Sequence, residues 1–147
     1  MAGQNGTDTG TRPGLAAFAG QWQAERVITD RQSGQVIRFA GTVTFRPDPD
    51  GLIWDEDGAL ILPGQAPIRA TRRYLWRAEG DGIAVFFDDG RPFHVIGPGA
   101  APAAHHDCPP DSYDVAYDFS GWPVWTARWQ VTGPRKDYTS ETEFQRG

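Results

Sequence analysis

The chain has few of the residues that mark disulfide-rich, nucleic-acid-binding or membrane-spanning proteins. Cys108 is the only cysteine among 147 residues, so no disulfide can form within the chain, and this favours a reducing compartment. Lys136 is the only lysine among 14 basic residues, and the formal net charge is -5. No run of basic residues indicates a nucleic-acid surface. We therefore expect no nucleic-acid partner.

Long apolar runs are also missing. No stretch approaches the roughly 20 apolar residues that a membrane helix needs, and residues 1–12 have no apolar core of signal-peptide length. These absences predict a cytoplasmic protein without a membrane partner. Residues 1–12 are rich in glycine, threonine and glutamine and predict a disordered lead, and residues 13–147 are of a length that suits one domain.

Turn-forming and aromatic residues are abundant instead. The chain has 18 Gly and 12 Pro, as expected of many turns, and 6 Trp, 4 Tyr and 8 Phe, which favour strands and bury large areas. From Gly20 onward, apolar residues recur at every second position in short segments, which is the period of a β-strand. The pair Asp57-Gly58 predicts a turn between a short strand at 52–56 and another at 59–62.

This pattern predicts an all-β fold, an antiparallel up-and-down barrel of about 8 to 10 strands, because closure removes exposed sheet edges. Pro13 to Phe18 predict one short helical turn, with Leu15 and Phe18 on the same side. We expect this turn to plug one end of the barrel. The alternative is an ordinary coil with two buried anchors.

Particular motifs resemble known barrels. Gly20-x-Trp22 at the start of an all-β chain resembles the calycin group, which includes lipocalins, fatty-acid-binding proteins and nitrobindin-like haem barrels. Five segments together resemble more closely a bacterial lipocalin-like family of unknown function: Arg72-x-Tyr74-x-Trp76, Asp89 to His94, His106-x-Cys108, Asp111-x-Tyr113 and the terminal Gly-Pro-Arg-Lys-Asp-Tyr of residues 133–138. The resemblance implies that Trp22 packs across the closed end under a late arginine, which is Arg128, Arg135 or Arg146. The haem-ligand motif of the haem barrels is not recognised here.

Two arginines share strand faces with large apolar residues. Arg26 is in register with Trp22, and Arg72 with Tyr74 and Trp76. If those faces point inward, each buried guanidinium needs an anion. The anion is either a ligand carboxylate, as the resemblance to fatty-acid-binding barrels implies, or an internal acid. The internal options are Glu25, Glu56 and Asp111. If the faces are reversed, both arginines are solvated.

His94, His106 and Cys108 form a second candidate cluster. His106 and Cys108 are two apart in an extended segment and so share a face. The trio contains the donor types that hold zinc, copper or haem iron, but it falls short of a metal motif. We predict that the three residues line a pocket and contact a ligand without holding a metal or other cofactor. Haem or a metal at these residues is the alternative.

The leading prediction is that the barrel interior binds a small, partly apolar molecule that carries an acidic group. The predicted ligand-binding residues are Arg26, Trp54, Arg72, Tyr74, Trp76, Phe87, His94, His106, Cys108, Tyr113, Tyr117 and Trp129. Arg135 and Lys136 follow a turn and are predicted to draw an anionic ligand to the barrel mouth.

Two other functions stay open. A small barrel enzyme, an isomerase, cyclase or hydrolase, would use His94, His106 and Tyr113 for proton transfer. An interaction module would have a filled core and no cavity. The sequence favours binding over catalysis, because no nucleophile triad, phosphate loop or paired-carboxylate spacing is present. We expect a monomer or a homodimer.

Overall fold

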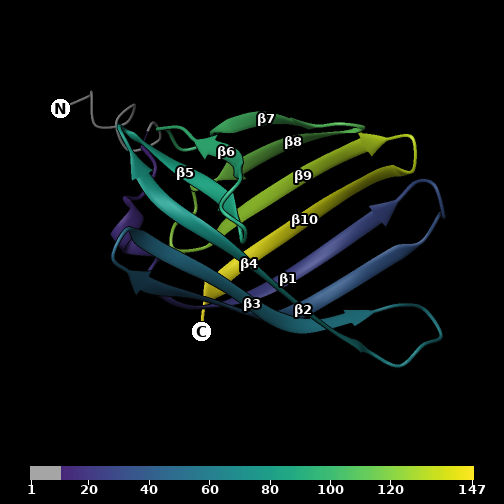
Figure 1. The fold of residues 1–147 in the computed structure, drawn as a ribbon. Helices are drawn as coiled ribbons and strands as arrows, with labels where there is room; N and C mark the ends of the chain where they lie inside the picture. Colours follow the sequence, from purple (N-terminus) through teal and green to yellow (C-terminus); the bar gives the residue numbers. More distant parts are fainter. Residues whose placement is uncertain (1–10) are drawn as a thin grey trace.

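Alternating side chains build one antiparallel sheet of ten strands in the computed structural model, which describes residues 11–147 (Figure 1). The strands are β1 (Gly20–Asp30), β2 (Val36–Asp48), β3 (Gly51–Ile61), β4 (Ile68–Glu79), β5 (Gly82–Phe87), β6 (Pro92–Ile96), β7 (Ala103–Cys108), β8 (Asp111–Asp118), β9 (Trp125–Gly133) and β10 (Lys136–Arg146).

The sheet closes almost completely on itself. Neighbouring strands in the sheet are also neighbours in the chain, except that β1 pairs with β10, so the order is β6-β5-β4-β3-β2-β1-β10-β9-β8-β7. In Figure 1, β4 crosses in front of β10 and β1, and the sheet curls until β6 lies beside β7. The predicted nearly closed antiparallel barrel is confirmed.

Alternation decides which residues face inward. Trp22, Ala24 and Arg26 of β1 are buried, while the residues between them are exposed. The same alternation holds in β3 up to Glu56, in the second half of β8, in β9 and in β10 from Ser140 onward. It fails in β6, where the neighbours Phe93 and His94 are both buried, because the pairing with β5 shifts register between Val85 and Phe86.

One end of the barrel is sealed by the 3-10 helix η1 (Leu15–Phe18), as predicted for a plug. Phe18 is fully buried, and its ring lies within 5.0–5.8 Å of five aromatic rings. The indole nitrogen of Trp22 donates to the Phe18 carbonyl at 2.8 Å. These contacts fix the helix across the barrel end.

Arg146 is the late arginine that covers Trp22. Its guanidinium carbon lies 3.9 Å from the centre of the Trp22 ring. Its two terminal nitrogens donate to the carbonyls of Ala17 and Ala19 at 2.6 and 2.9 Å. The register of β1 on β10 explains the choice, because Trp22 and Arg146 are direct cross-strand partners.

The closed half of the barrel is filled with aromatic rings. Trp125 stacks on Phe144 with centroids 3.9 Å apart, and Trp54 and Trp76 pack nearby at 5.7 Å from each other. All four are buried. Any opening into the barrel must therefore lie toward the other end, where the turns at 31–35, 109–110 and 134–135 are found.

The predicted turn at Asp57-Gly58 is wrong. β3 runs unbroken from Gly51 to Ile61, so the two expected short strands are one. Gly58 faces Gly41 of β2, and the Phe39 ring covers both. A Cβ on Gly58 would come within 2.6 Å of the Phe39 ring and would also collide with the Ala40 carbonyl. The glycine therefore serves close packing inside a strand instead of a turn.

Replacing Gly58 with alanine should consequently lower the free energy of unfolding by about 1–3 kcal/mol, because Phe39 must leave its position over the sheet. Denaturant unfolding measures the change. Gly97→Ala is the control, since a Cβ there meets nothing within 4 Å. Equal stability of the two variants would contradict this packing role.

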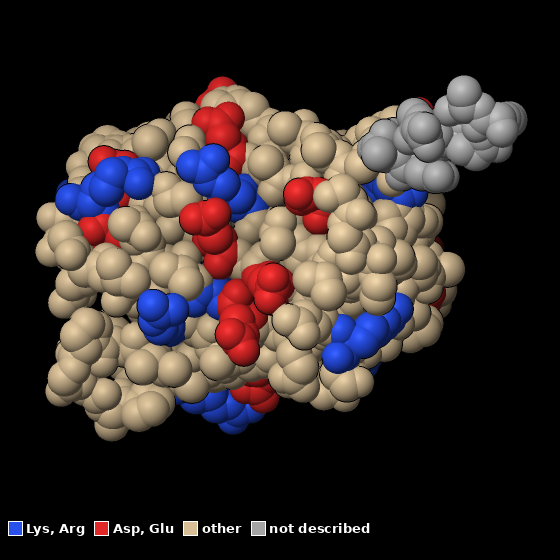
Figure 2. Space-filling view, turned by 180° about the vertical axis from the view of Figure 1, so that it is seen from behind, with Lys and Arg blue, Asp and Glu red and all other residues tan. Residues whose placement is uncertain are grey.

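The outer surface carries interleaved charges of both signs. Figure 2 shows acidic and basic side chains alternating over the face opposite to that of Figure 1. Asp55 accepts from Arg46 at 2.6 Å and from Arg73 at 2.7 Å. The predicted disordered lead falls mostly outside the described residues, but Arg12 donates to the Asp81 carbonyl at 2.7 Å. No helix within residues 11–147 is long and apolar enough to cross a membrane.

Candidate functional site

Three charged side chains form a group inside the barrel, on the open-end side of the aromatic core. Glu56 of β3 receives two hydrogen bonds from Arg26 of β1, at 2.7 and 3.0 Å, and one from Arg72 of β4, at 2.8 Å. Alternation brings all three inside, because Glu56 shares a face with Leu52 and Trp54. Of the internal acids that the sequence offers, Glu56 is therefore the partner of both arginines.

The group has one more cation than anion, because two guanidiniums share one carboxylate. Burial alone would raise the pKa of Glu56, but the hydrogen bonds and charges of the two arginines outweigh it and hold that pKa below its ordinary value. Glu56 is thus ionised at neutral pH, and the barrel interior keeps one uncompensated positive charge.

The two arginines differ in whether their guanidinium N–H groups are free to bind a ligand. The side chain of Arg26 is 6% exposed and fully engaged, since its Nε donates to Thr142 at 2.7 Å and its guanidinium lies over the Phe39 ring. The Arg72 side chain is 33% exposed. Its Nε binds Glu56 and its Nη1 binds the Tyr74 hydroxyl at 3.3 Å, whereas its Nη2 makes no hydrogen bond among residues 11–147. Arg72 is therefore the cation that a ligand can reach.

A hollow of about 140 Å³ adjoins both arginines at the open end of the barrel. We call it the mouth hollow. It is lined by Arg26, Ile28, Asp30, Arg72, Trp129, Tyr138 and Ser140. The Asp30 carboxylate is solvated at the outer rim and accepts from the backbone amides of the turn at 31–35. Its charge is therefore better screened by water than that of the buried group.

Aromatic rings surround Phe93 next to the mouth hollow. We call them the Phe93 cluster. The rings whose centres lie within 4.5–6.0 Å of Phe93 on this side are Phe87, His106, Trp129, Tyr113 and Tyr74. Phe93 itself is 3% exposed, whereas Phe87, His106, Tyr113 and Trp129 are partly exposed. The cluster thus has a buried floor and a partly open rim, and Arg72 lies over Trp129 at 5.1 Å.

The two inward histidines lie in different surroundings. His94 is 7% exposed, and its Nε2 is 2.8 Å from the Tyr117 hydroxyl. Its Nδ1 has no hydrogen-bond partner among the described residues. Burial, aided by the charge of His106, lowers the pKa of His94 to about 3. A neutral imidazole with this pKa is too weak a base to take up a proton near neutral pH.

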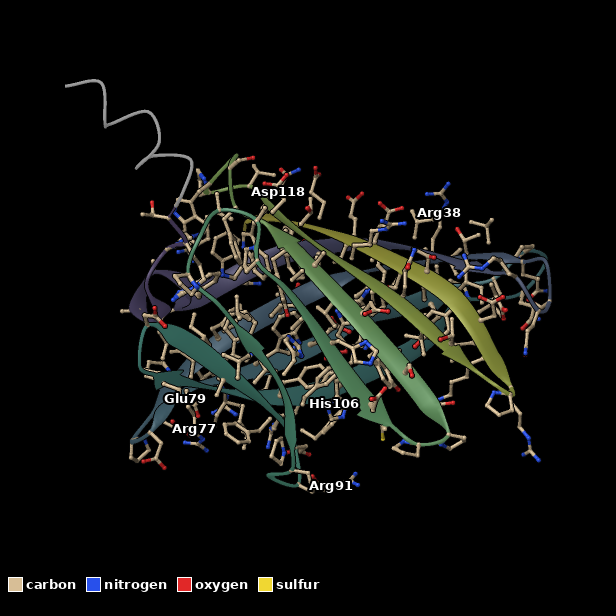
Figure 3. The ribbon with its side chains drawn as sticks, turned by 90° about the horizontal axis from the view of Figure 1, so that it is seen from above. Arg38, Arg77, Glu79, Arg91, His106 and Asp118 are labelled. Atoms are coloured by element: carbon tan, nitrogen blue, oxygen red, sulfur yellow. The ribbon has the colours of Figure 1, made fainter. Side chains whose placement is uncertain are left out.

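His106 lies at the barrel seam. Figure 3 shows it between β7 and the β5–β6 hairpin, whereas Arg91 lies at the hairpin tip away from the interior. Cys108 follows on the same side of β7 and is partly exposed. Among the described residues, no group of three or more His, Cys, Asp or Glu side chains is arranged to hold a metal ion.

The structure divides the predicted ligand-binding residues into three groups. Arg72 and Trp129 border the mouth hollow, together with the engaged Arg26. Tyr74, Phe87, His106 and Tyr113 belong to the Phe93 cluster, and Cys108 is near it on β7. Trp54, Trp76 and Tyr117 are buried, the two tryptophans among the packed rings of the closed half, and His94 bonds Tyr117.

The predicted portal residues lie at the open end. Arg135 and Lys136 are both exposed beside the turn between β9 and β10. The ammonium of Lys136 is 3.1 Å from the Asp111 carboxylate, which ties this turn to the start of β8.

Sequence reasoning missed several residues of the site. Tyr138 and Ser140 line the mouth hollow, and they share a face of β10 with Thr142 and Phe144, so alternation could have found them. Phe93 could not be found in this way, because the register shift places it and His94 inside together.

A larger hollow lies on the outside of the sheet. It measures about 570 Å³ and runs over β1, β2, β9 and β10, mostly between outward side chains such as Glu25, Arg38, Arg128 and Glu141. Acids and bases are mixed along it, and most of its lining residues are exposed. Two further hollows, of about 450 and 500 Å³, also border Arg72. Of these three, the mouth hollow is the smallest, but it alone is lined by both arginines of the buried charge group.

Comparisons with known proteins agree with the barrel. An S-type phycobiliprotein lyase from Guillardia theta superimposes with a TM-score of 0.66 over 90% of each chain at 9% sequence identity. A protein of unknown function from the DUF3598 family of Nostoc punctiforme gives a TM-score of 0.54 at 14% identity, over 91% of this chain and 49% of that one. At these identities the likeness shows the lipocalin-like barrel fold alone.

Sequence comparison identifies the family. No curated protein matches the chain. A family profile does match, over residues 18–146, which include the plug residue Phe18, all ten strands and Arg146. The chain therefore belongs to the family of unknown function DUF6314.

Proposed function

We propose that this protein binds a small, partly apolar acid at the open end of its barrel, with the acidic group on Arg72. The observation that carries the proposal is the excess positive charge of the Arg26–Glu56–Arg72 group next to the mouth hollow. A partly buried guanidinium with a free N–H attracts a carboxylate more strongly than an exposed one does, because water screens it less.

The size of the hollow supports a small ligand. Pockets for drug-sized molecules usually measure about 300–1,000 Å³, and the mouth hollow measures about 140 Å³. The closed half of the barrel is occupied by aromatic rings, since Trp54, Trp76, Trp125 and Phe144 pack against one another. The apolar part of the ligand would thus rest on Trp129 and Tyr138, beside the Phe93 cluster.

Arg72→Met tests the proposal. Binding of 2-naphthoate, measured by isothermal titration calorimetry, should weaken by about 10–100-fold, because a charge-assisted hydrogen bond contributes about 1.5–3 kcal/mol. The fold should persist, since Arg26 keeps both bonds to Glu56 and methionine retains much of the apolar stem. The neutral probe 2-naphthalenemethanol should bind the parent protein weakly. It should bind the Arg72→Met variant with about the same affinity as the parent.

The matched control is Arg73→Met. Arg73 is the next residue on β4, but it points outward to Asp55. This variant removes the same formal charge and should leave naphthoate binding within about twofold, because an exposed charge is screened. Equal losses in both variants, or equal binding of acid and alcohol by the parent protein, would contradict the assignment of Arg72.

A further inference from the structure

The mouth hollow has flat walls. Trp129 contributes an indole and Tyr138 a phenol, while Arg26 and Arg72 contribute planar guanidiniums. Ile28 is the one aliphatic side chain among its lining residues. Aromatic rings and guanidiniums both attract the face or edge of another planar π-system. An alkyl chain, by contrast, makes no such face or edge contact and gains only from apolar area.

The positions of the flat groups are fixed by their neighbours. The centre of the Trp129 ring lies 5.3 Å from that of Phe93 and 6.2 Å from those of Tyr74 and Tyr113. Arg72 is held by Glu56 and the Tyr74 hydroxyl, with its guanidinium 5.1 Å from the Trp129 ring. A wall whose rings are already packed loses little conformational freedom on binding, which favours a rigid, flat ligand.

We infer that the acid bound at the mouth hollow is planar, an aromatic or conjugated carboxylate of one or two rings. This inference rests on the proposed function and names its ligand class. Arg72 receives the carboxylate through its free Nη2, and the ring system lies against Trp129 and Tyr138. Saturated acids of the same size reach Arg72 but lack the contacts with the flat walls.

A pair of matched acids tests the inference. The probes are 2-naphthoate and decahydro-2-naphthoate, which have the same carbon number and the same carboxylate but differ in planarity. Isothermal titration calorimetry should give about 3–10-fold tighter binding of the planar acid to the parent protein, from the ring contacts with Trp129 and Tyr138. In Trp129→Leu the wall stays apolar but is no longer flat, and the preference should fall below about twofold.

Trp122→Leu is the matched control. Trp122 is also partly exposed, but it lies at the closed end beside Phe18. This variant should keep the full preference for the planar acid. If both acids bind the parent protein equally and both depend on Arg72, the planar class is wrong while the proposed function stands. If neither acid binds, or neither depends on Arg72, both are wrong. Loss of the preference in Trp122→Leu as well as in Trp129→Leu would also overturn the inference.

Discussion

Replacing Glu56 with glutamine should lower the free energy of unfolding by about 3–5 kcal/mol, because it removes the charge that compensates the buried guanidinium of Arg26. The shape of the side chain hardly changes, so the loss reports charge rather than packing. Arg26 cannot become neutral by losing a proton, since a guanidinium stays protonated in proteins. Chemical denaturation at pH 7 measures the difference.

The effect of Glu56→Gln should depend on pH in a defined direction. The folded-state pKa of Glu56 is lowered, so its ionised form stabilises the fold above the ordinary glutamate pKa. This contribution is lost as the pH falls through the lower folded-state pKa. The stability difference between parent and variant should therefore shrink as the pH is lowered below the ordinary value. Glu141→Gln, at an exposed position of β10, is the control and should change stability by under about 0.5 kcal/mol. A Glu56→Gln variant as stable as this control would contradict the buried charge group.

Trp22→Ala should also cost about 3–5 kcal/mol, since the indole is fully buried at the closed end. The change opens a cavity beneath Arg146 and removes the hydrogen bond to the Phe18 carbonyl. Trp22→Phe keeps most of the ring and should lose less than half as much stability. Thermal and denaturant unfolding give both values. A loss below about 1 kcal/mol for Trp22→Ala would mean that the plug and the Trp22 ring do not close the barrel together.

The barrel could be predicted from the sequence because the features that indicate it are local. Gly20-x-Trp22, the period-two segments and the Gly/Pro turns each act over a few residues, and together they determine the antiparallel meander. The same alternation turned Arg26 and Arg72 inward with their apolar neighbours. The error at Gly58 has a clear cause, because a glycine beside aspartate looks like a turn until Phe39 is seen to lie over it.

The remaining features depend on pairing between distant segments. Arg146 covers Trp22 only because the first and last strands pair in one particular register, which alternation does not specify. Alternation alone excludes Glu25, which precedes the inward Arg26 and so points outward. The choice of Glu56 over Asp111, however, depends on β3 pairing between β2 and β4. The size of the mouth hollow follows from how deeply the aromatic rings interlock, which composition does not reveal.

A crystal structure of the protein with 2-naphthoate tests the central claim most directly. The account predicts the carboxylate within hydrogen-bond distance of Arg72 Nη2, and the ring system against Trp129 in the mouth hollow. The bonds from Arg26 to Glu56 should be unchanged. Naphthoate bound only in the outer hollow over β1, β2, β9 and β10, or absent from the barrel at saturating concentration, would contradict the claim that this barrel binds acids at its open end.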